Sequence, residues 1–153
     1  MTTQDERAVV VDTSAAVAVI LDEPGSDDLV GYLENAAARL MSAASRVELG
    51  IVIEARLGPA GVDAISRFLR DADVVVVDVD IAAADRALSA WRRYGKGRNR
   101  AALNFGDCFT YALAERTGLP LLCTGDDFAA TDLEVIRPAS PATQGSRGRT
   151  TRG

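Results

Sequence analysis

The sequence contains no histidine, only two cysteines and a single lysine among its 153 residues. Without histidine, Ser-His-Asp catalysis, Cys-His catalysis and every imidazole metal site are excluded, so a bound metal would need oxygen ligands. Cys108 and Cys123 fit no zinc motif and cannot build a disulfide framework, which is typical of a reducing cytosol. We therefore expect a cytoplasmic protein in which both thiols are buried as small apolar side chains.

Long hydrophobic runs are also missing. The longest, Ala15 to Leu21 and Val74 to Val77, fall far short of the ~18 to 20 residues that a membrane span needs. Met1 to Arg7 are polar and the apolar run behind them is broken at Asp12, so we expect no secretory signal. Hydrophobic residues make up 48% and charged residues 25%, with a net charge of −5, which indicates one globular domain without a membrane segment.

Short apolar runs alternate with helical patterns along the chain. Strands are expected at residues 8–11, 39–41, 74–77, 121–124 and 133–136. Helices are expected from residue 13 to 21, from a cap at Ser26, from Ser42 or Ser45 to 56, at 59–72, at 81–93 and after Asn104. This order, without tandem hairpins, predicts a mainly parallel sheet with helices on both faces. Residues 1–137 then form one domain, and 138–153 a disordered polar and basic tail.

Acidic residues interrupt or follow apolar segments at four places: Asp12, Glu48, Asp107 and the pair Asp126-Asp127. Each has an ordinary explanation, because Asp12 suits a helix cap, Asp107 a capping box with Asn104, and the pair a turn. However, ligands gather at the carboxyl ends of parallel strands, and two of the four positions are expected there. A shared site would require the carboxylates from all four places to lie close together in the fold.

Glu48 is the most informative of these acids, because its neighbours on a helix include Ala44, Ile51 and Val52. Burying an unpaired carboxylate would cost several kcal/mol, so Glu48 needs an arginine, strong hydrogen bonds or a metal. If the acids converge, their repulsion raises some of the pKa values unless a divalent cation neutralises them. Oxygen ligands select Mg²⁺ or Mn²⁺, which activates water and stabilises a leaving oxygen in phosphodiester cleavage.

A basic stretch from Arg86 to Leu103 holds six basic residues and no acidic one, together with Trp91 and Tyr94. Arginines with aromatics suit a single nucleic-acid strand whose bases are unstacked. The alternative is a solvated helix end with Trp91 in the core; the expected helix at 81–93 would turn Ala84, Ala87, Leu88 and Trp91 inward. The candidate RNA contacts in this stretch are Arg93, Lys96, Arg98 and Arg100.

Four motifs occur in a fixed order between Val9 and Pro138. They are Val-Val-Val-Asp12-Thr13-Ser14-Ala15, Glu48 on an early helix, Tyr94-Gly-Lys-Gly97 leading to Leu103-Asn-Phe-Gly-Asp107-Cys-Phe109, and Leu121-Leu-Cys-Thr-Gly-Asp-Asp-Phe128. In this order and spacing the chain resembles the VapC-type ribonuclease toxins of the PIN-domain family. The resemblance implies a three-layer α/β/α sandwich and Mg²⁺-dependent endonucleolytic cleavage of RNA, with Mn²⁺ as an alternative ion.

By the same resemblance, Asp12 and Asp107 match the principal metal ligands, Glu48 the third acid and Asp126 the fourth. The last motif departs from the family, because Gly125 stands where an acid is common, so Asp127 is an alternative to Asp126. Thr13 and Ser14 are expected to bind a ligand carboxylate or the metal-bound water, with Ser14 near the substrate.

The resemblance also implies partners. A VapB-type antitoxin would lay a C-terminal segment across a groove near the first helices, around Val19, Leu29 and Leu33, and the toxin would form a homodimer.

Three other functions are less consistent with the sequence. A haloacid-dehalogenase-like phosphatase with Asp12 as nucleophile needs a second acid where this chain has Ser14. A receiver-like signalling domain needs a lysine after its last strand, and Lys96 is elsewhere. A catalytically inactive PIN-like binding module should have lost one of its acids, whereas Asp12, Glu48 and Asp107 are all present.

Overall fold

The computed structural model describes residues 7–139, and its centre is a sheet in which every neighbouring pair of strands is parallel. The strand order is β3-β2-β1-β4-β5. The strands are β1 (Val9–Val11), β2 (Arg39–Ser42), β3 (Val74–Val77), β4 (Leu121–Leu122) and β5 (Val135–Ile136). Because β1 is the central strand, its carboxyl end lies between those of β2 and β4.

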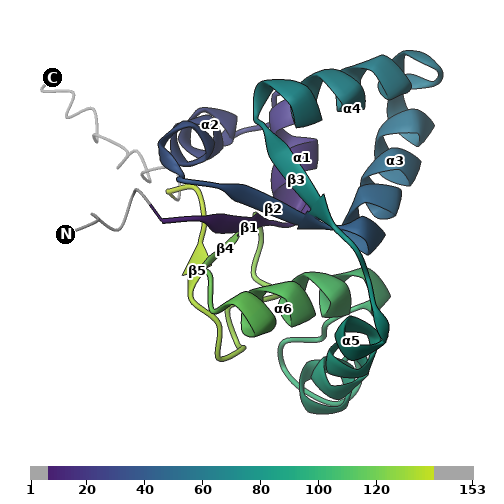
Figure 1. The fold of residues 1–153 in the computed structure, drawn as a ribbon, viewed down its shortest axis with the longest axis vertical. Coiled ribbons are helices and arrows are strands. Elements are labelled where there is room, and N and C mark those ends of the chain that lie inside the picture. Colours follow the sequence, from purple (N-terminus) through teal and green to yellow (C-terminus); the bar gives the residue numbers. More distant parts are fainter. Residues whose placement is uncertain (1–6, 140–153) are drawn as a thin grey trace, which may run out of the picture.

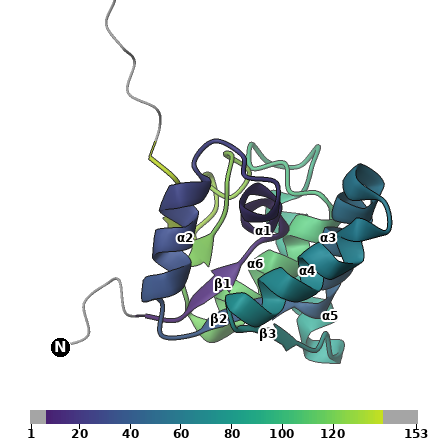
Figure 2. The ribbon, with the colours of Figure 1, turned by 90° about the horizontal axis from the view of Figure 1, so that it is seen from above.

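Six helices in the described chain cover the two faces of the sheet. They are α1 (Thr13–Ile20), α2 (Ser26–Asn35), α3 (Ala43–Leu57), α4 (Ala60–Asp71), α5 (Ile81–Tyr94) and α6 (Phe105–Thr117). Helices α1 to α4 lie on one side, and α5 and α6 on the other (Figure 1). Seen from above, α1 lies between α2 and α3 (Figure 2). The predicted three-layer α/β/α sandwich is confirmed.

The sheet divides the core into two clusters. Val9 and Val11 face the cluster under α1 to α4, whereas Val10, between them, faces α5 and α6. This alternation is the two-residue period of a strand, and all three side chains are buried. A central parallel strand is apolar on both faces for this reason, which explains why the sequence around Asp12 begins with three valines.

Two expected details of the helices differ in the structure. Gly25, at φ 90°, is the N-cap of α2, and Ser26 is the first helical residue, whose hydroxyl donates to Asp22 instead. On α5 the buried residues are Ala87 and Ala90, whereas Leu88 is 46% and Trp91 40% exposed. The prediction is therefore confirmed for Ala87 and wrong for Ala84, Leu88 and Trp91, because α6 covers only the face of α5 that bears Ala87 and Ala90.

The two cysteines are buried and unpaired, as expected. Burial raises the pKa of Cys123 to about 12, and the nearby Asp12 carboxylate adds to that rise, so the thiol is neutral. No helix within residues 7–139 is long and apolar enough to cross a bilayer. The predicted tail at 138–153 lies almost wholly outside the described residues.

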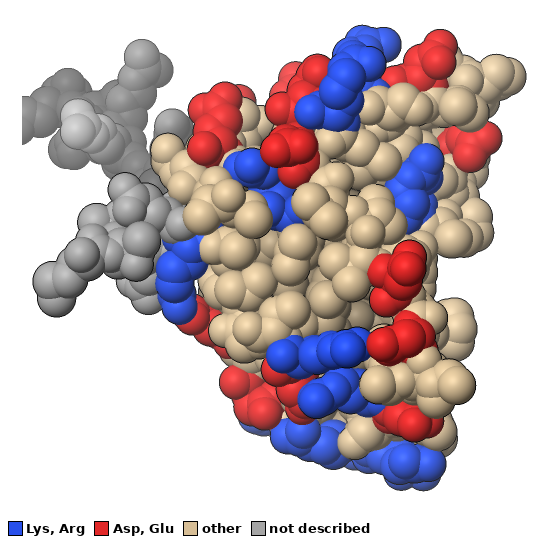
Figure 3. Space-filling model, in the orientation of Figure 1, with Lys and Arg blue, Asp and Glu red and all other residues tan. Residues whose placement is uncertain are grey.

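Among the described residues, β3 is an edge strand of the sheet. Val75 is 53% and Val76 40% exposed, since this strand has a neighbour, β2, on one side only. Figure 3 shows this face of the molecule, on which a broad uncharged band separates the charged side chains above and below it.

Candidate functional site: an acidic cleft at the strand ends

The end of β1 places Asp12 at the start of α1. Asp12 is the N-cap of that helix, and its side chain accepts a hydrogen bond from the Ser14 amide at 3.1 Å. Its backbone amide donates to Leu122 in β4, which ties the residue to the neighbouring strand. The capping role that the sequence allowed is therefore real, but it leaves the carboxylate at the carboxyl edge of the sheet.

Asp107 is held by the first turn of α6. The Asn104 side chain accepts from the Asp107 amide at 2.9 Å, and the Asp107 carboxylate accepts from the Asn104 amide at 3.1 Å, which completes a capping box. Only Oδ2 takes part, and Oδ1 makes no hydrogen bond within residues 7–139. Asp107 is 7% exposed, so this oxygen belongs to a nearly buried carboxylate.

Two hydroxyl groups link Asp12 to both sides of the sheet. Thr110 of α6 donates to one Asp12 oxygen at 2.8 Å, and Ser14 donates to the other at 2.6 Å. Thr110 also lies 3.0 Å from the Ser45 hydroxyl of α3, and both are 1% exposed. The Ser14 hydroxyl in turn accepts from the Thr124 amide. Asp12 is thus fixed in one orientation by three separate segments.

The acids surround a cleft of about 310 Å³. Five acidic residues line it: Asp12, Glu23, Glu48, Asp107 and Asp127. Burial raises the pKa of Asp107 to about 7, and although the Asn104 amide opposes this, the charges of Asp12, Asp127 and Glu48 add to the rise. Acids from three distant segments therefore act on the carboxyl group of Asp107, so the four segments meet at one site.

Glu48 reaches the cleft from α3 by passing close to α6. A methyl group added at Gly106 would overlap the Glu48 carboxylate, so the glycine makes room for it. No ion pair of Glu48 exists among the described residues, although the sequence left an arginine partner open. Its helical neighbour Ile51 is 67% exposed, which shows that Glu48 lies at the rim of the core rather than inside it.

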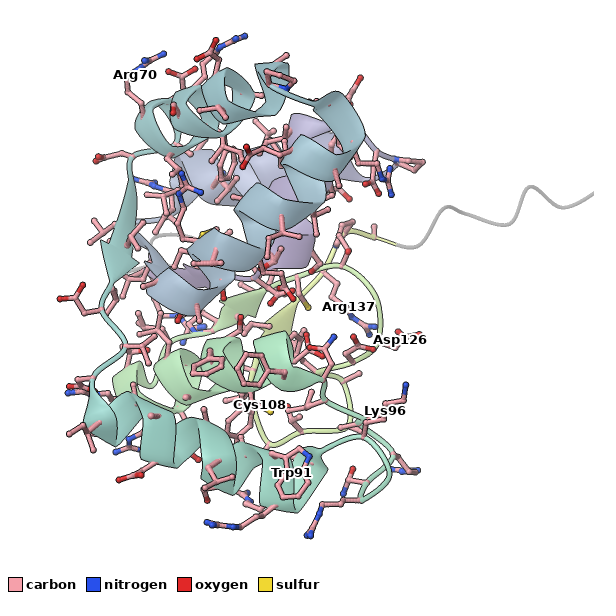
Figure 4. The ribbon with its side chains drawn as sticks, turned by 90° about the vertical axis from the view of Figure 1, so that its right-hand side faces the viewer. Arg70, Trp91, Lys96, Cys108, Asp126 and Arg137 are labelled. Atoms are coloured by element: carbon pink, nitrogen blue, oxygen red, sulfur yellow. The ribbon has the colours of Figure 1, made fainter. Side chains whose placement is uncertain are left out.

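The structure separates Asp126 from the other acids. The Asp126 side chain is 92% exposed and forms an ion pair with Arg137, and the two lie side by side in Figure 4. Asp127 lines the cleft instead and contributes to the raised pKa of Asp107. The structure places Asp127, and not Asp126, at the cleft, whereas the role of either as the fourth acid stays a prediction. Gly125, at φ 76°, directly precedes the two aspartates.

The candidate RNA contacts occupy three different settings. Ser14 lines the acidic cleft, and Lys96 lines a separate cavity that shares Asn104 with it. Arg98 lies over the Trp91 ring at 4.3 Å, and Arg100 is exposed on the same loop.

Arg93 is engaged elsewhere. It forms ion pairs with Glu115 and Asp132 and lies 4.8 Å from the Tyr94 ring centre. The Tyr111 hydroxyl donates to Asp132 at 2.5 Å, and this hydrogen bond, more than the Arg93 charge, lowers the pKa of Asp132. The structure therefore places Arg93 in a polar cluster on α5 and α6, outside the acidic cleft.

The donor set of the cleft fits a magnesium ion. Within residues 7–139 no three Asp, Glu, His or Cys side chains, as they stand, are arranged to surround an ion. Mg²⁺, however, keeps several waters and takes only one or two protein carboxylates. Asp12 and Asp107 supply such a pair, and the free Oδ1 of Asp107 is the kind of atom that a cation would satisfy.

Comparisons with known proteins identify the family of this chain. The PIN domain family model matches residues 9–133. The chain belongs to the PIN-domain family. It is 48% identical to Ribonuclease VapC of Mycolicibacterium smegmatis over 128 residues, which cover 84% of this chain and 99% of that protein.

Solved structures share the PIN fold. One is Mycobacterium tuberculosis VapC20, a Sarcin-Ricin loop cleaving toxin, with a TM-score of 0.70 and 18% identity; the match covers 85% of this chain and 99% of that chain. The fold is also shared with VapBC2 from Rickettsia felis, bound to a promoter DNA fragment, with a TM-score of 0.69, 12% identity, and coverage of 86% and 99%.

Sequence reasoning missed two residues of this PIN-domain site, Thr110, which is buried behind the cleft, and Glu23, which lines it. Thr110 lies three residues after Asp107, and a polar residue one helical turn from an acid on an apolar helix was a usable signal. Glu23 lines the cleft from the turn after α1, where it reads as an ordinary loop acid. No local pattern distinguishes it.

Proposed function

We propose that this PIN-domain chain is the toxin of a VapBC-type toxin–antitoxin pair, an Mg²⁺-dependent endoribonuclease of the cytoplasm. The observation that carries the proposal is the pairing of two nearly buried carboxylates, Asp12 and Asp107, at one cleft. Burial of Asp107 next to Asp12 disfavours the charged form of Asp107 in the absence of a cation, and therefore points to a binding role. Membership among ribonucleases named VapC supports RNA as the substrate.

The polar residues at the cleft divide into three tasks in this proposal. Asp12 and Asp107 would hold Mg²⁺, while Thr110 and Ser14 keep the Asp12 carboxylate oriented. Bound Mg²⁺ would supply a water of lowered pKa and stabilise the leaving oxygen of the phosphodiester. Glu48 and Asp127 would orient that water through hydrogen bonds. Ser14 cannot serve as the second acid of a phosphatase, because its hydroxyl is committed to Asp12 and Thr124.

The antitoxin would occupy the groove between α1, α2 and α4. This groove has a volume of about 570 Å³ and is lined by Val19 and Leu33, as expected from the sequence, and also by Phe68. Leu29, the third residue expected there, is fully buried in the core and is not available. The fold shared with the R. felis VapBC2 assembly supports an antitoxin partner.

The test is an RNA cleavage assay with purified, antitoxin-free protein. A pool of structured and single-stranded RNAs is incubated with Mg²⁺ or with chelator, beside Asp12→Asn and Asp107→Asn variants. We expect Mg²⁺-dependent cutting that each variant reduces by more than about 100-fold, because each substitution removes a ligand charge but little volume. A folded variant that cuts at the wild-type rate would refute the proposed ligands. No cutting together with no Mg²⁺ binding would indicate an inactive binding module.

A further inference from the structure

A second cavity lies beside the acidic cleft, between α5 and α6. It has a volume of about 600 Å³ and its lining is almost entirely apolar. Its aromatic walls are Trp91, Phe105 and Phe109, and Lys96 and Asn104 provide its polar groups. Phe105 is 81% exposed, although it is among the largest apolar side chains of the described protein. An aromatic ring left so open at the edge of a cavity indicates a binding surface.

The aromatic side chains are held in defined positions. Phe105 and Phe109 pack edge to face with ring centres 5.0 Å apart, one helical turn from each other on α6. Trp91 packs on Gly95, where any side chain would overlap the indole ring, and the Arg98 guanidinium covers it at 4.3 Å. Rings that are fixed in advance lose little entropy when a flat ligand stacks on them.

The cavity and the acidic cleft are neighbours. Asn104 lines both of them, and the capping box joins it directly to Asp107. In Figure 4, Trp91 lies on α5 and Lys96 on the loop that leads from α5 toward α6, and both flank the end of α6 that bears Asp107. A polymer with a phosphate at Asp107 can therefore place an adjoining unit in the cavity.

The charges at the cavity favour a polyanion with flat apolar groups. Within residues 7–139, Lys96 is the only charged residue in its lining, and Arg98 adds a second cation at Trp91. Cations beside exposed aromatic rings match the backbone and the bases of single-stranded RNA. No acidic residue of the described chain lines this cavity, in contrast to the neighbouring cleft with five.

We propose that the cavity formed by Trp91, Phe105 and Phe109 receives an unstacked RNA base next to the phosphate that is cut in the acidic cleft. This inference rests on the proposed function and adds how the substrate is held. Stacking tolerates any base, and the lining offers few polar groups, so the cavity positions the strand without selecting one base. Lys96 and Arg98 contact the phosphates on either side of that base.

The test compares two probes that differ only in their bases. A labelled ten-nucleotide uridine RNA and an abasic oligomer with the same backbone and length are titrated without Mg²⁺, and binding is read as fluorescence anisotropy. Phe105→Ala should weaken binding of the uridine RNA by roughly 5- to 150-fold, the range for one stacked base, and leave the abasic oligomer unaffected. Ile81→Ala is the matched control, because Ile81 is 82% exposed on α5 and does not line the cavity.

Several outcomes would overturn the inference. Equal losses for both probes, or no loss, would show that Phe105 does not stack on a base. A changed sedimentation mass of Phe105→Ala without any base-dependent loss would assign the cavity to contact with a second copy. The assay requires no cleavage, so a base-dependent loss in a protein that cuts no RNA would support the cavity while refuting the nuclease proposal. Failure of the wild type to bind either probe would overturn the base-binding cavity, while the nuclease proposal is decided separately by the cleavage assay.

Discussion

Asp107 shows how a single residue can serve function at the expense of stability. Its carboxyl group is almost buried beside three other acids, and burial raises its pKa from 3.8 to about 7. Between those two pH values the folded state keeps a proton that the unfolded chain has already released. The free energy of unfolding therefore falls as the pH rises from about 4 to 7, and is lowest in the range where the carboxylate is charged.

The Asp107→Asn variant should reverse this loss. Asparagine keeps the capping acceptor but carries no charge, so the metal-free variant should be more stable than the wild type at pH 8, by up to about 4 kcal/mol for a shift of some three pKa units. The difference should vanish near pH 4. Urea unfolding at both pH values measures it. Added Mg²⁺ should stabilise the wild type but not the variant, and a variant less stable than the wild type at pH 8 would contradict this account.

Asp126 and Asp127 offer a second comparison at the scale of one residue. Asp127 lines the cleft, whereas Asp126 is paired with Arg137 outside it. We expect Asp127→Asn to slow RNA cleavage by about 10- to 100-fold, as for groups that orient a metal ligand, and Asp126→Asn to leave the rate nearly unchanged. Initial cleavage rates of the two variants decide the point. The opposite ranking would restore Asp126 as the fourth acid.

At the scale of the element, α6 organises the cleft. Its capping box fixes Asp107, its next turn presents Thr110 to Asp12, and its glycine at 106 lets Glu48 approach from α3. One helix can supply these groups to one site because residues three or four apart share one face. The first turns of α6 therefore position the Asp107 carboxylate, the Thr110 hydroxyl donor and, at Gly106, the space that the Glu48 carboxylate occupies.

Gly106→Ala should displace Glu48 while leaving Asp107 and Thr110 in place. The new methyl group would push the Glu48 carboxylate away, and since that carboxylate ends a flexible side chain, we expect little change in thermal stability but about a 10- to 100-fold loss of cleavage. Gly31→Ala is the control, because nothing lies near the added methyl group. In a Glu48→Ala background, Gly106→Ala should have no additional effect. A full further loss there would place its action elsewhere.

At the scale of the whole molecule, α3 presents an apolar face to solvent. Val47 is 62% and Ile51 67% exposed, one helical turn apart. Family resemblance predicts a homodimer, and these residues are a candidate contact between copies.

We expect the wild type to sediment as a dimer and Ile51→Glu as a folded monomer, because a charge on each copy would be buried in the interface. Analytical ultracentrifugation measures this, with Val62→Glu on α4 as the control, since Val62 is 49% exposed on a different helix. A monomeric wild type would refute the homodimer, and an unchanged dimer in Ile51→Glu would move the interface away from α3.

Local sequence patterns are enough to predict the alternation of strands and helices, the capping of α1 and α6, and three candidate acids of the cleft. These features depend on local chemistry: β-branched runs, cap residues and the spacing of apolar positions. The resemblance to VapC toxins then linked Asp12, Glu48 and Asp107 to one site.

Tertiary packing determines which aspartate after Gly125 faces the cleft, that Glu23 lines it, that Thr110 donates to Asp12 behind it, and that Trp91 stays exposed. A turn conformation and the coverage of a helix face depend on elements that are distant in sequence. The helical spacing of α5 places Trp91 on an apolar face that is typical of a core. However, α6 packs on Ala87 and Ala90, and this leaves the indole ring at a cavity. Periodicity identifies an apolar face, and packing alone determines what covers it.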